Sequence, residues 1–227
     1  MGLNSRVFDL MAQFGKRNVA DGRVLVAGYP DFLVHPEILI KHLGHCDFPI
    51  APFSEQIKIG HNEPDLDHSR DARAVFKALG YPTMDVVDLY PERGCERRVD
   101  LNERQDLGEY DLVLDHGTIE HCFNIAEAAR NLASTVCESG IIVQHLPLNL
   151  YNHGFYNLSP TWFYDFYGLN GFEILHFEGW CMESLASYPL PAFADFSLVP
   201  RSSLLTMVAR RIQMQPITFP IQGRYRR

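Results

Sequence analysis

The chain has 227 residues, 46% of them hydrophobic and 21% charged, with a formal net charge of −8. This length and hydrophobic content suffice for the core of one α/β domain, so we expect a single domain over residues 1–227. The negative charge argues against a nucleic-acid-binding surface, because affinity for a phosphate backbone comes from clustered Lys and Arg. The basic residues Arg224, Arg226 and Arg227 at the end of the sequence are interpreted as a solvated tail.

Neither a membrane-spanning segment nor a signal peptide is predicted. No apolar run approaches the roughly 20 residues that cross a bilayer, and no basic segment precedes an apolar run and cleavage site. The five cysteines are odd in number and contain no Cys-x-x-Cys pair, so they indicate neither a disulfide framework nor a zinc knuckle. We therefore expect a soluble, cytoplasmic protein that does not itself bind membranes.

Hydrophobic periodicity predicts helices alternating with strands. In chain order, the predicted elements are a helix at Asn4–Lys16, a strand at Arg23–Ala27, helices at Pro36–Leu43 and Asp67–Leu79, a strand at Met84–Val87, a short element ending near Val99, a strand at Leu112–Leu114, a helix at Cys122–Cys137, a strand at Gly140–Gln144, a helix at Thr161–Tyr167, and strands at Phe172–Phe177 and Leu204–Ala209. In the helix at Cys122–Cys137, the residues predicted to face inward are Ala126, Ala129, Leu132, Ala133 and Val136. Residues 32–62 and 180–200 lack this regularity and are interpreted as an inserted cap and a late insertion.

The alternation of strands and helices implies right-handed crossovers and parallel strands. We therefore predict fold class α/β, with a Rossmann-like, doubly wound, mostly parallel sheet, flanking helices and an inserted cap segment. In such sheets, ligands bind beyond the carboxyl ends of the strands.

The segment from Tyr110 to Asn124 says most about function. It reads Tyr-Asp-Leu-Val-Leu-Asp-His-Gly-Thr-Ile-Glu-His-Cys-Phe-Asn. The apolar run Leu112–Leu114 is typical of a strand covered on both faces. Polar side chains then gather at its carboxyl end, and these are Asp115, His116, Thr118, Glu120 and His121. This cluster is a candidate site.

This segment resembles the post-strand motif of class I S-adenosylmethionine-dependent methyltransferases. It is most similar to a branch, often associated with surface carbohydrate biosynthesis, that carries an Asp-Gly-Gly-Thr-Leu-Glu-His-Val-Phe-Asn-like stretch. Residues 147–160 resemble the same branch's Pro-x-Asn…Gly-His-Gly-Phe-Tyr-Gln-Phe-Ser-Pro motif. The resemblance extends from Arg23 to about Phe177. It implies S-adenosylmethionine as cofactor and methyl transfer to a small or carbohydrate-like acceptor, at oxygen.

The resemblance also implies which residues bind the cofactor. Gly28 stands in the first turn, where several glycines are usual in the family, and Asp88 stands where an acid accepts the ribose hydroxyls. Asp100 and Asn102 match an Asp-Leu-Asn that meets the adenine, and Asp115 lies beside them at the sheet edge. The alternatives are structural: Asp88 ends a strand, and Asp100 with Asn102 forms a turn.

The same resemblance places the reacting groups after residue 115. Methyl transfer is an in-line displacement, and a hydroxyl acceptor must lose a proton, which a histidine can take at neutral pH. His121 is our first choice for this base and His116 our second, with Glu120 as the orienting carboxylate. The alternative is that Glu120 and His121 only open the next helix, where an acidic residue is favoured.

His153, Tyr156 and Asn157 are predicted to bind the acceptor, because an aromatic loop with amides and imidazole suits a polyol. The alternative is a packed lid. His145, His153 and Asp115 lack a recognised ligand spacing, so no metal site is predicted. Two other functions stay open: a non-catalytic methyltransferase-like binding protein, and another Rossmann-like enzyme that uses the histidines for metal-assisted chemistry.

Overall fold

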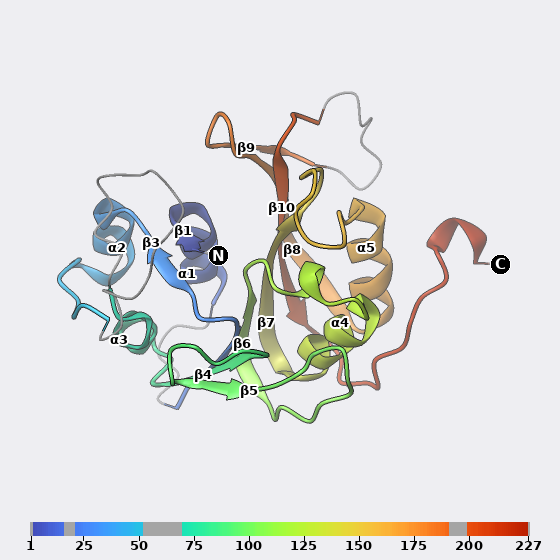
Figure 1. Ribbon diagram of the computed structural model, residues 1–227. Coiled ribbons are helices and arrows are strands. Elements are labelled where there is room, and N and C mark those ends of the chain that lie inside the picture. Colours follow the sequence, from blue (N-terminus) through green and yellow to red (C-terminus); the bar gives the residue numbers. More distant parts are fainter. Residues whose placement is uncertain (1, 16–20, 52–69, 191–198, 227) are drawn as a thin grey trace.

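The computed structural model describes residues 2–15, 21–51, 70–190 and 199–226, and the chain there is organised around an eight-stranded sheet (Figure 1). The strand order is β5-β4-β2-β6-β7-β10-β8-β9. The strands are β2 (Arg23–Ala27), β4 (Thr83–Asp88), β5 (Glu96–Arg98), β6 (Tyr110–Asp115), β7 (Val136–Pro147), β8 (Phe172–Cys181), β9 (Ala186–Pro189) and β10 (Ser203–Arg211). A separate pair joins β1 (Gly2–Asn4) to β3 (Asp31–Leu33) in parallel.

The first five strands of the large sheet confirm the predicted doubly wound fold. Strands β5, β4, β2, β6 and β7 are all parallel, and their order in space is 3-2-1-4-5 in chain order, as in the dinucleotide-binding fold. The order reverses between β2 and β6, which is where such sheets bind ligands. Beyond β7 the sheet becomes antiparallel, with β10 between β7 and β8.

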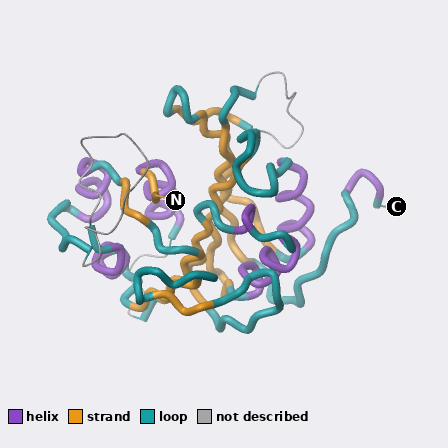
Figure 2. Tube along the Cα trace, viewed as in Figure 1, coloured by secondary structure: helices purple, strands orange, loops and turns teal. Residues whose placement is uncertain are grey.

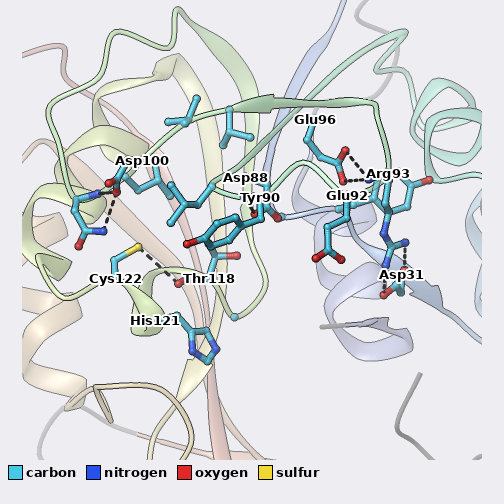
Figure 3. A pocket seen from close by; sticks show the side chains of 18 residues that line it. Asp31, Asp88, Tyr90, Glu92, Arg93, Glu96, Asp100, Thr118, His121 and Cys122 are labelled. Carbon is cyan, nitrogen blue, oxygen red and sulfur yellow. Dashed lines mark hydrogen bonds and ion pairs between the residues drawn. The ribbon is translucent and has the colours of Figure 1, made fainter. Parts of the chain in front are cut away.

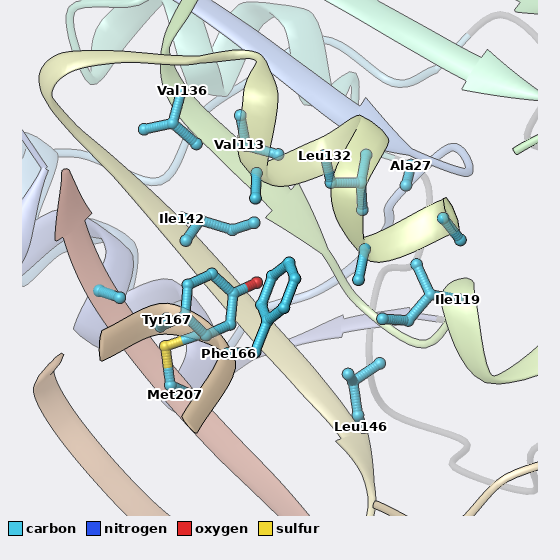
Figure 4. Packing of buried hydrophobic residues seen from close by; sticks show 14 of the residues in the cluster. Ala27, Val113, Ile119, Leu132, Val136, Ile142, Leu146, Phe166, Tyr167 and Met207 are labelled. Atoms are coloured by element: carbon cyan, nitrogen blue, oxygen red, sulfur yellow. The ribbon is translucent and has the colours of Figure 1, made fainter. Parts of the chain in front are cut away.

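Helices cover both faces of the sheet (Figure 2). The helices are α1 (Ser5–Phe14), α2 (Pro36–Leu43), α3 (Ala72–Ala78), α4 (Ile125–Ser134) and α5 (Pro160–Leu169). Because successive strand residues point to opposite faces, Leu25 and Ala27 of β2 join the core under α4 and α5. Val24 and Val26 join the core under α1 and α3. Figure 4 shows the first core, in which Tyr167 of α5 packs among aliphatic side chains of the sheet.

The helix ends confirm several predictions and correct others. Asn4, where the first predicted helix starts, is the N-cap of α1, and its side chain accepts the Val7 N–H at 2.9 Å. Helix α3 begins at Ala72 after its N-cap Asp71, and the first residues of the predicted range, 67–69, lie outside the described residues.

Helix α4 is shorter than the predicted helix at Cys122–Cys137. It begins at Ile125, because the 3-10 turn Ile119–His121 precedes it and Asn124 supplies its cap. Its predicted inward residue Ala126 is exposed, whereas the others are buried. The helix ends at Ser134, because Val136 already pairs with Tyr110 in the sheet.

The two predicted insertions are described only in part. Of residues 32–62, the structure describes 32–51, which hold the end of β3 and α2; of residues 180–200, it leaves out 191–198. The cap, the late insertion and the single-domain boundaries therefore stay predictions. Among the helices of the described ranges, none has the length and hydrophobicity needed to cross a bilayer.

An ion pair ties α1 to the antiparallel part of the sheet. Arg6 Nε and Nη2 each lie 2.8 Å from a carboxylate oxygen of Glu178 on β8, and His176 Nε2 lies 3.0 Å from Glu178 Oε2. Burial alone would raise the pKa of Glu178, but hydrogen bonds from Arg6 and His176 outweigh it and hold this pKa at about 2. The ionised carboxylate is therefore favoured by folding.

This lowered pKa predicts acid sensitivity. A group whose pKa is lower in the folded state contributes stability above its unfolded pKa, near 4.5, and loses it as the pH falls toward about 2. With about 1.4 kcal/mol per pKa unit, and a discount because Arg6 is partly exposed, we expect Glu178→Gln to remove about 1–2 kcal/mol at pH 7. Urea unfolding at pH 7 and pH 3 should show this difference shrinking at the lower pH. The control Glu173→Gln, at an exposed position of the same strand, should change little; equal losses in both variants would contradict the prediction.

Candidate functional site

A cleft of about 470 Å³ opens at the carboxyl ends of β2 and β4, next to the turn after β6 (Figure 3). Its position is the switch point predicted to bind a ligand. Its volume is in the usual range for small-molecule sites. Of the predicted site residues, it is lined by Gly28, Asp88, Asp100, Asn102 and His121.

The first turn of the cleft is built on Gly28. This glycine has a φ of +75°, and a Cβ placed there would lie 3.2 Å from Thr118 Oγ1. Its N–H donates to the Val87 carbonyl, and the Thr118 hydroxyl donates to the Ala27 carbonyl at 2.7 Å. The turn therefore needs glycine both for its backbone conformation and for the close approach of residue 118.

The chain does not continue from this turn into a helix. Within residues 28–43, all of them described, it passes through β3 and enters α2 only at Pro36, after the N-cap His35. In dinucleotide-binding proteins, the pyrophosphate sits on the helix N-terminus that directly follows the first strand. In this chain the first turn has no such helix N-terminus, so it cannot bind a pyrophosphate in that way.

Asp88 ends β4 at the cleft wall, where its Oδ1 accepts the Tyr90 N–H at 3.0 Å. Asp100 Oδ1 accepts both the backbone N–H and the side-chain amide of Asn102, at 2.9 and 2.8 Å. Asn102 Oδ1 in turn accepts the Asn124 N–H. Asp100 and Asn102 thus form the turn that the structural alternative predicted, and they also line the cleft.

The cleft is acidic. Among the described residues, its lining carries one guanidinium and five carboxyl groups, which belong to Asp31, Asp88, Glu92, Glu96 and Asp100. The guanidinium, that of Arg93, is paired with Asp31, and the Glu96 carboxylate accepts the Arg93 backbone N–H (Figure 3). Such a lining favours a cationic ligand and disfavours one with several phosphates.

Asp115 lies beneath the cleft and is not part of its lining. It is fully buried, with its carboxylate accepting hydrogen bonds from Gln144 Nε2 at 2.8 Å and from the Thr118 N–H at 3.0 Å. Burial raises the pKa of Asp115. Asp115 is therefore a positioning residue, because its carboxylate holds the turn that carries Thr118.

His116 is also buried. Its ring packs 4.8 Å from that of His145, and neither of its nitrogens has a hydrogen-bond partner among the described residues. Burial, followed by the charge of His145, lowers its pKa well below the usual value. His116 does not line the cleft, so an acceptor bound in the cleft would contact His121 and not His116.

Glu120, His121 and His153 form a cluster at the edge of the cleft. Glu120 is fully buried, and its Oε1 lies 3.8 Å from His121 Nε2 and 3.6 Å from His153 Nε2. The two imidazole rings meet edge to face, 5.2 Å apart. His121 is half exposed and is one of the residues that line the cleft (Figure 3). Burial, and then the charge of Asp115, raise the pKa of Glu120, whereas burial lowers the pKa of both histidines.

The loop that carries His153 is fastened to this turn by hydrogen bonds. The Phe155 N–H donates to the Glu120 carbonyl at 2.8 Å, and the Tyr156 hydroxyl donates to the Phe123 carbonyl at 2.7 Å. Asn157 Oδ1 accepts the Leu150 N–H within the loop. Tyr156 and Asn157 thus shape the loop, and their contact with an acceptor stays a prediction.

Sequence reasoning placed Thr118 in the candidate cluster without a role of its own, and it did not assign Tyr90 to the site, although both line the cleft. Thr118 bridges the turns after β2 and β6 through its bonds to Ala27 and Asp115. The Tyr90 side chain is exposed and lies across the middle of the cleft (Figure 3). Its signal was an aromatic residue two positions after the acid that ends a strand.

Comparison with models of protein families finds no match, and comparison with curated proteins finds none either. Among solved structures, the N-methyltransferase NodS from Bradyrhizobium japonicum WM9, in complex with S-adenosyl-L-homocysteine, is 9% identical with a TM-score of 0.45, over 92% of this chain and 87% of that one. An S-adenosylmethionine-dependent methyltransferase from Mesorhizobium loti is 13% identical with a TM-score of 0.45, over 89% and 96%. The [4+2]-cyclase SpnF is 15% identical with a TM-score of 0.45, over 91% and 80%. Similarities of this size assign neither an activity nor a ligand to the chain.

Proposed function

We propose that this protein binds S-adenosylmethionine in the cleft and transfers its methyl group to an oxygen of a small or carbohydrate-like acceptor. The observation that carries the proposal is an acidic cleft at the switch point of a doubly wound sheet, with Asp88 at the end of β4 and, in the described residues 28–35, no helix that directly follows β2. This combination suits an adenosine with a cationic sulfonium and disfavours a dinucleotide.

Each part of the cofactor has a matching group in the cleft. The Asp88 carboxylate can accept both ribose hydroxyls, since it offers several lone pairs in one plane. The Tyr90 ring offers an aromatic face to the adenine, and Asp100 with Asn102 lies at the far end of the same cleft. The open turn at Gly28 leaves backbone close to the methionine part.

The methyl group would be transferred toward the cluster of Glu120, His121 and His153. Burial, and then the charge of His153, lower the pKa of His121, so its imidazole is neutral at pH 7 and can take a proton from an acceptor hydroxyl. Glu120 lies 3.8 Å from that imidazole, beyond hydrogen-bond distance. Glu120 could therefore orient the His121 imidazole, as predicted, only if the Glu120 side chain shifted closer to it.

An acceptor bound beside this cluster would meet aromatic side chains. Phe123 and Phe155 are both exposed, and their rings meet edge to face at 5.6 Å. Such faces pack against the C–H surfaces of a sugar, while His153, Tyr156 and Asn157 could bond its hydroxyls. This composition supports the proposal of a carbohydrate-like acceptor.

Titration calorimetry tests the cofactor part of the proposal. We expect S-adenosylmethionine and its demethylated product, S-adenosylhomocysteine, each to bind with one site per chain and a Kd in the range of about 1 μM to 1 mM. NADH should not bind, because the described residues 28–35 after β2 offer its pyrophosphate no helix N-terminus and the cleft lining is acidic. Binding of NADH alone would contradict the proposal, and binding of none of the three would favour the non-catalytic alternative.

A further inference from the structure

We infer that Glu120, His121 and His153 form a binding site for one divalent transition-metal ion, with Zn²⁺ as the best match to its ligands. Each residue presents one ligand atom, and the three atoms lie within 4.8 Å of one another. Within the described ranges, no other group of three His, Cys, Asp or Glu side chains comes this close.

The separations of the ligand atoms suit a metal ion better than hydrogen bonds. Ligand atoms at about 2.0–2.2 Å from a tetrahedral Zn²⁺ are roughly 3.3–3.6 Å apart. Glu120 Oε1 lies 3.6 Å from His153 Nε2 and 3.8 Å from His121 Nε2. A direct carboxyl–imidazole hydrogen bond would be about 2.7–2.9 Å long, so the three side chains leave room for an ion between them.

The Glu120 carboxyl group is otherwise without a partner. The residue is fully buried, and neither of its oxygens has a hydrogen-bond partner among the described residues. The Nε2 atom of His153 is likewise buried and without a hydrogen bond there. Burying unpartnered polar atoms costs free energy. A cation bound by Glu120 and His153 would satisfy both groups at once.

The backbone holds the three ligands together. Glu120 and His121 are neighbours on one 3-10 turn, whereas His153 arrives on the loop after β7. Gly154, with a φ of +69°, lets that loop approach closely, because a Cβ there would lie 2.9 Å from both Cγ and the carbonyl O of Glu120. The hydrogen bond from Phe155 N–H to the same carbonyl fixes the contact. The approach of the two segments is therefore built into the fold.

Two imidazoles and one carboxylate are a ligand set that Zn²⁺ uses with an open fourth position. Because His121 lines the cleft, an open position on that side would face it. If the proposed function is right, an acceptor hydroxyl could bind there, and the ion would lower its pKa. With the ion bound, His121 would be a metal ligand. Its imidazole would act as a free base only in the metal-free protein.

The test uses the full chain without cofactor, so its result does not depend on the proposed function. After removal of metal with EDTA and dialysis, titration with Zn²⁺ should show one site per chain and a rise in Tm. Co²⁺ should give visible absorption bands of a tetrahedral or five-coordinate site. Loss of an outer partner already weakens metal binding by about 10–100-fold, so Glu120→Gln and His153→Ala should each weaken it by at least about 100-fold.

The control His45→Ala removes an exposed histidine that is outside the cluster and should bind Zn²⁺ as the parent does. If Glu120→Gln fails to fold, His153→Ala decides, because its side chain is partly exposed on a loop. No stoichiometric binding by the parent protein, or equal binding by parent and His153→Ala, would overturn the inference. Zn²⁺ binding without S-adenosylmethionine binding would support the metal site and contradict the proposed function alone.

Discussion

His121→Ala is expected to lower the turnover of methyl transfer by about 10²–10⁴-fold, the usual contribution of a group that assists proton transfer. Among the histidines of the described residues, His121 lines the cleft. The affinity for S-adenosylmethionine should stay within about twofold, because Asp88 and the turn at Gly28 lie on other strands. Turnover is followed as S-adenosylhomocysteine released with an acceptor found by screening nucleotide sugars.

His45→Ala is the matched control and should leave turnover unchanged, since that histidine is exposed and does not line the cleft. Chelator separates the two ways in which His121 could act. If its imidazole takes the proton directly, EDTA-treated parent protein keeps its turnover; if it holds a metal ion, turnover falls and returns with Zn²⁺. Normal turnover of a folded His121→Ala protein would remove this residue from the reaction.

Local sequence signals predicted most of the sheet and several helix ends. Strand β2 and helix α2 have their predicted bounds, and Asn4 caps α1, because hydrophobic spacing and capping act within a few residues. The predicted end of helix α4 was wrong, because the position where this helix stops depends on a residue far away in the sequence. Val136 leaves the helix to pair with Tyr110, and helical periodicity alone cannot show such a contact.

The candidate site divides in the same way. The resemblance implied that Gly28, Asp88 and Asp100 belong to one cofactor site at the carboxyl ends of the strands, and the structure brings them together along one cleft. The directions of Asp115 and His116 could not be predicted, because both turn into the interior beneath the cleft. The approach of the residue-153 loop to the residue-120 turn was equally hidden. For that reason, linear spacing predicted no metal site where the fold gathers three ligands.

Asp88→Ala is expected to weaken the binding of S-adenosylmethionine by about 1.5–3 kcal/mol, or roughly 10–150-fold in Kd. The variant removes a carboxylate that would accept hydrogen bonds from two ribose hydroxyls. Asp88 bonds within the chain to the Tyr90 N–H, in an exposed turn, so the fold should survive its loss. Calorimetry with S-adenosylhomocysteine should show the same loss, because both cofactor forms carry the same ribose.

Asp85→Ala is the control on the same strand. Its carboxylate bonds to Arg23 and to the Tyr110 hydroxyl and is outside the cleft lining, so its removal should lower stability without changing cofactor affinity. The pair of variants thus separates loss of ribose binding from a general weakening of β4. Unchanged affinity in Asp88→Ala, with a parent-like Tm, would show that Asp88 only ends its strand. In that case, the carboxylates that attract the cationic cofactor would have to be those of Glu92 or Asp100.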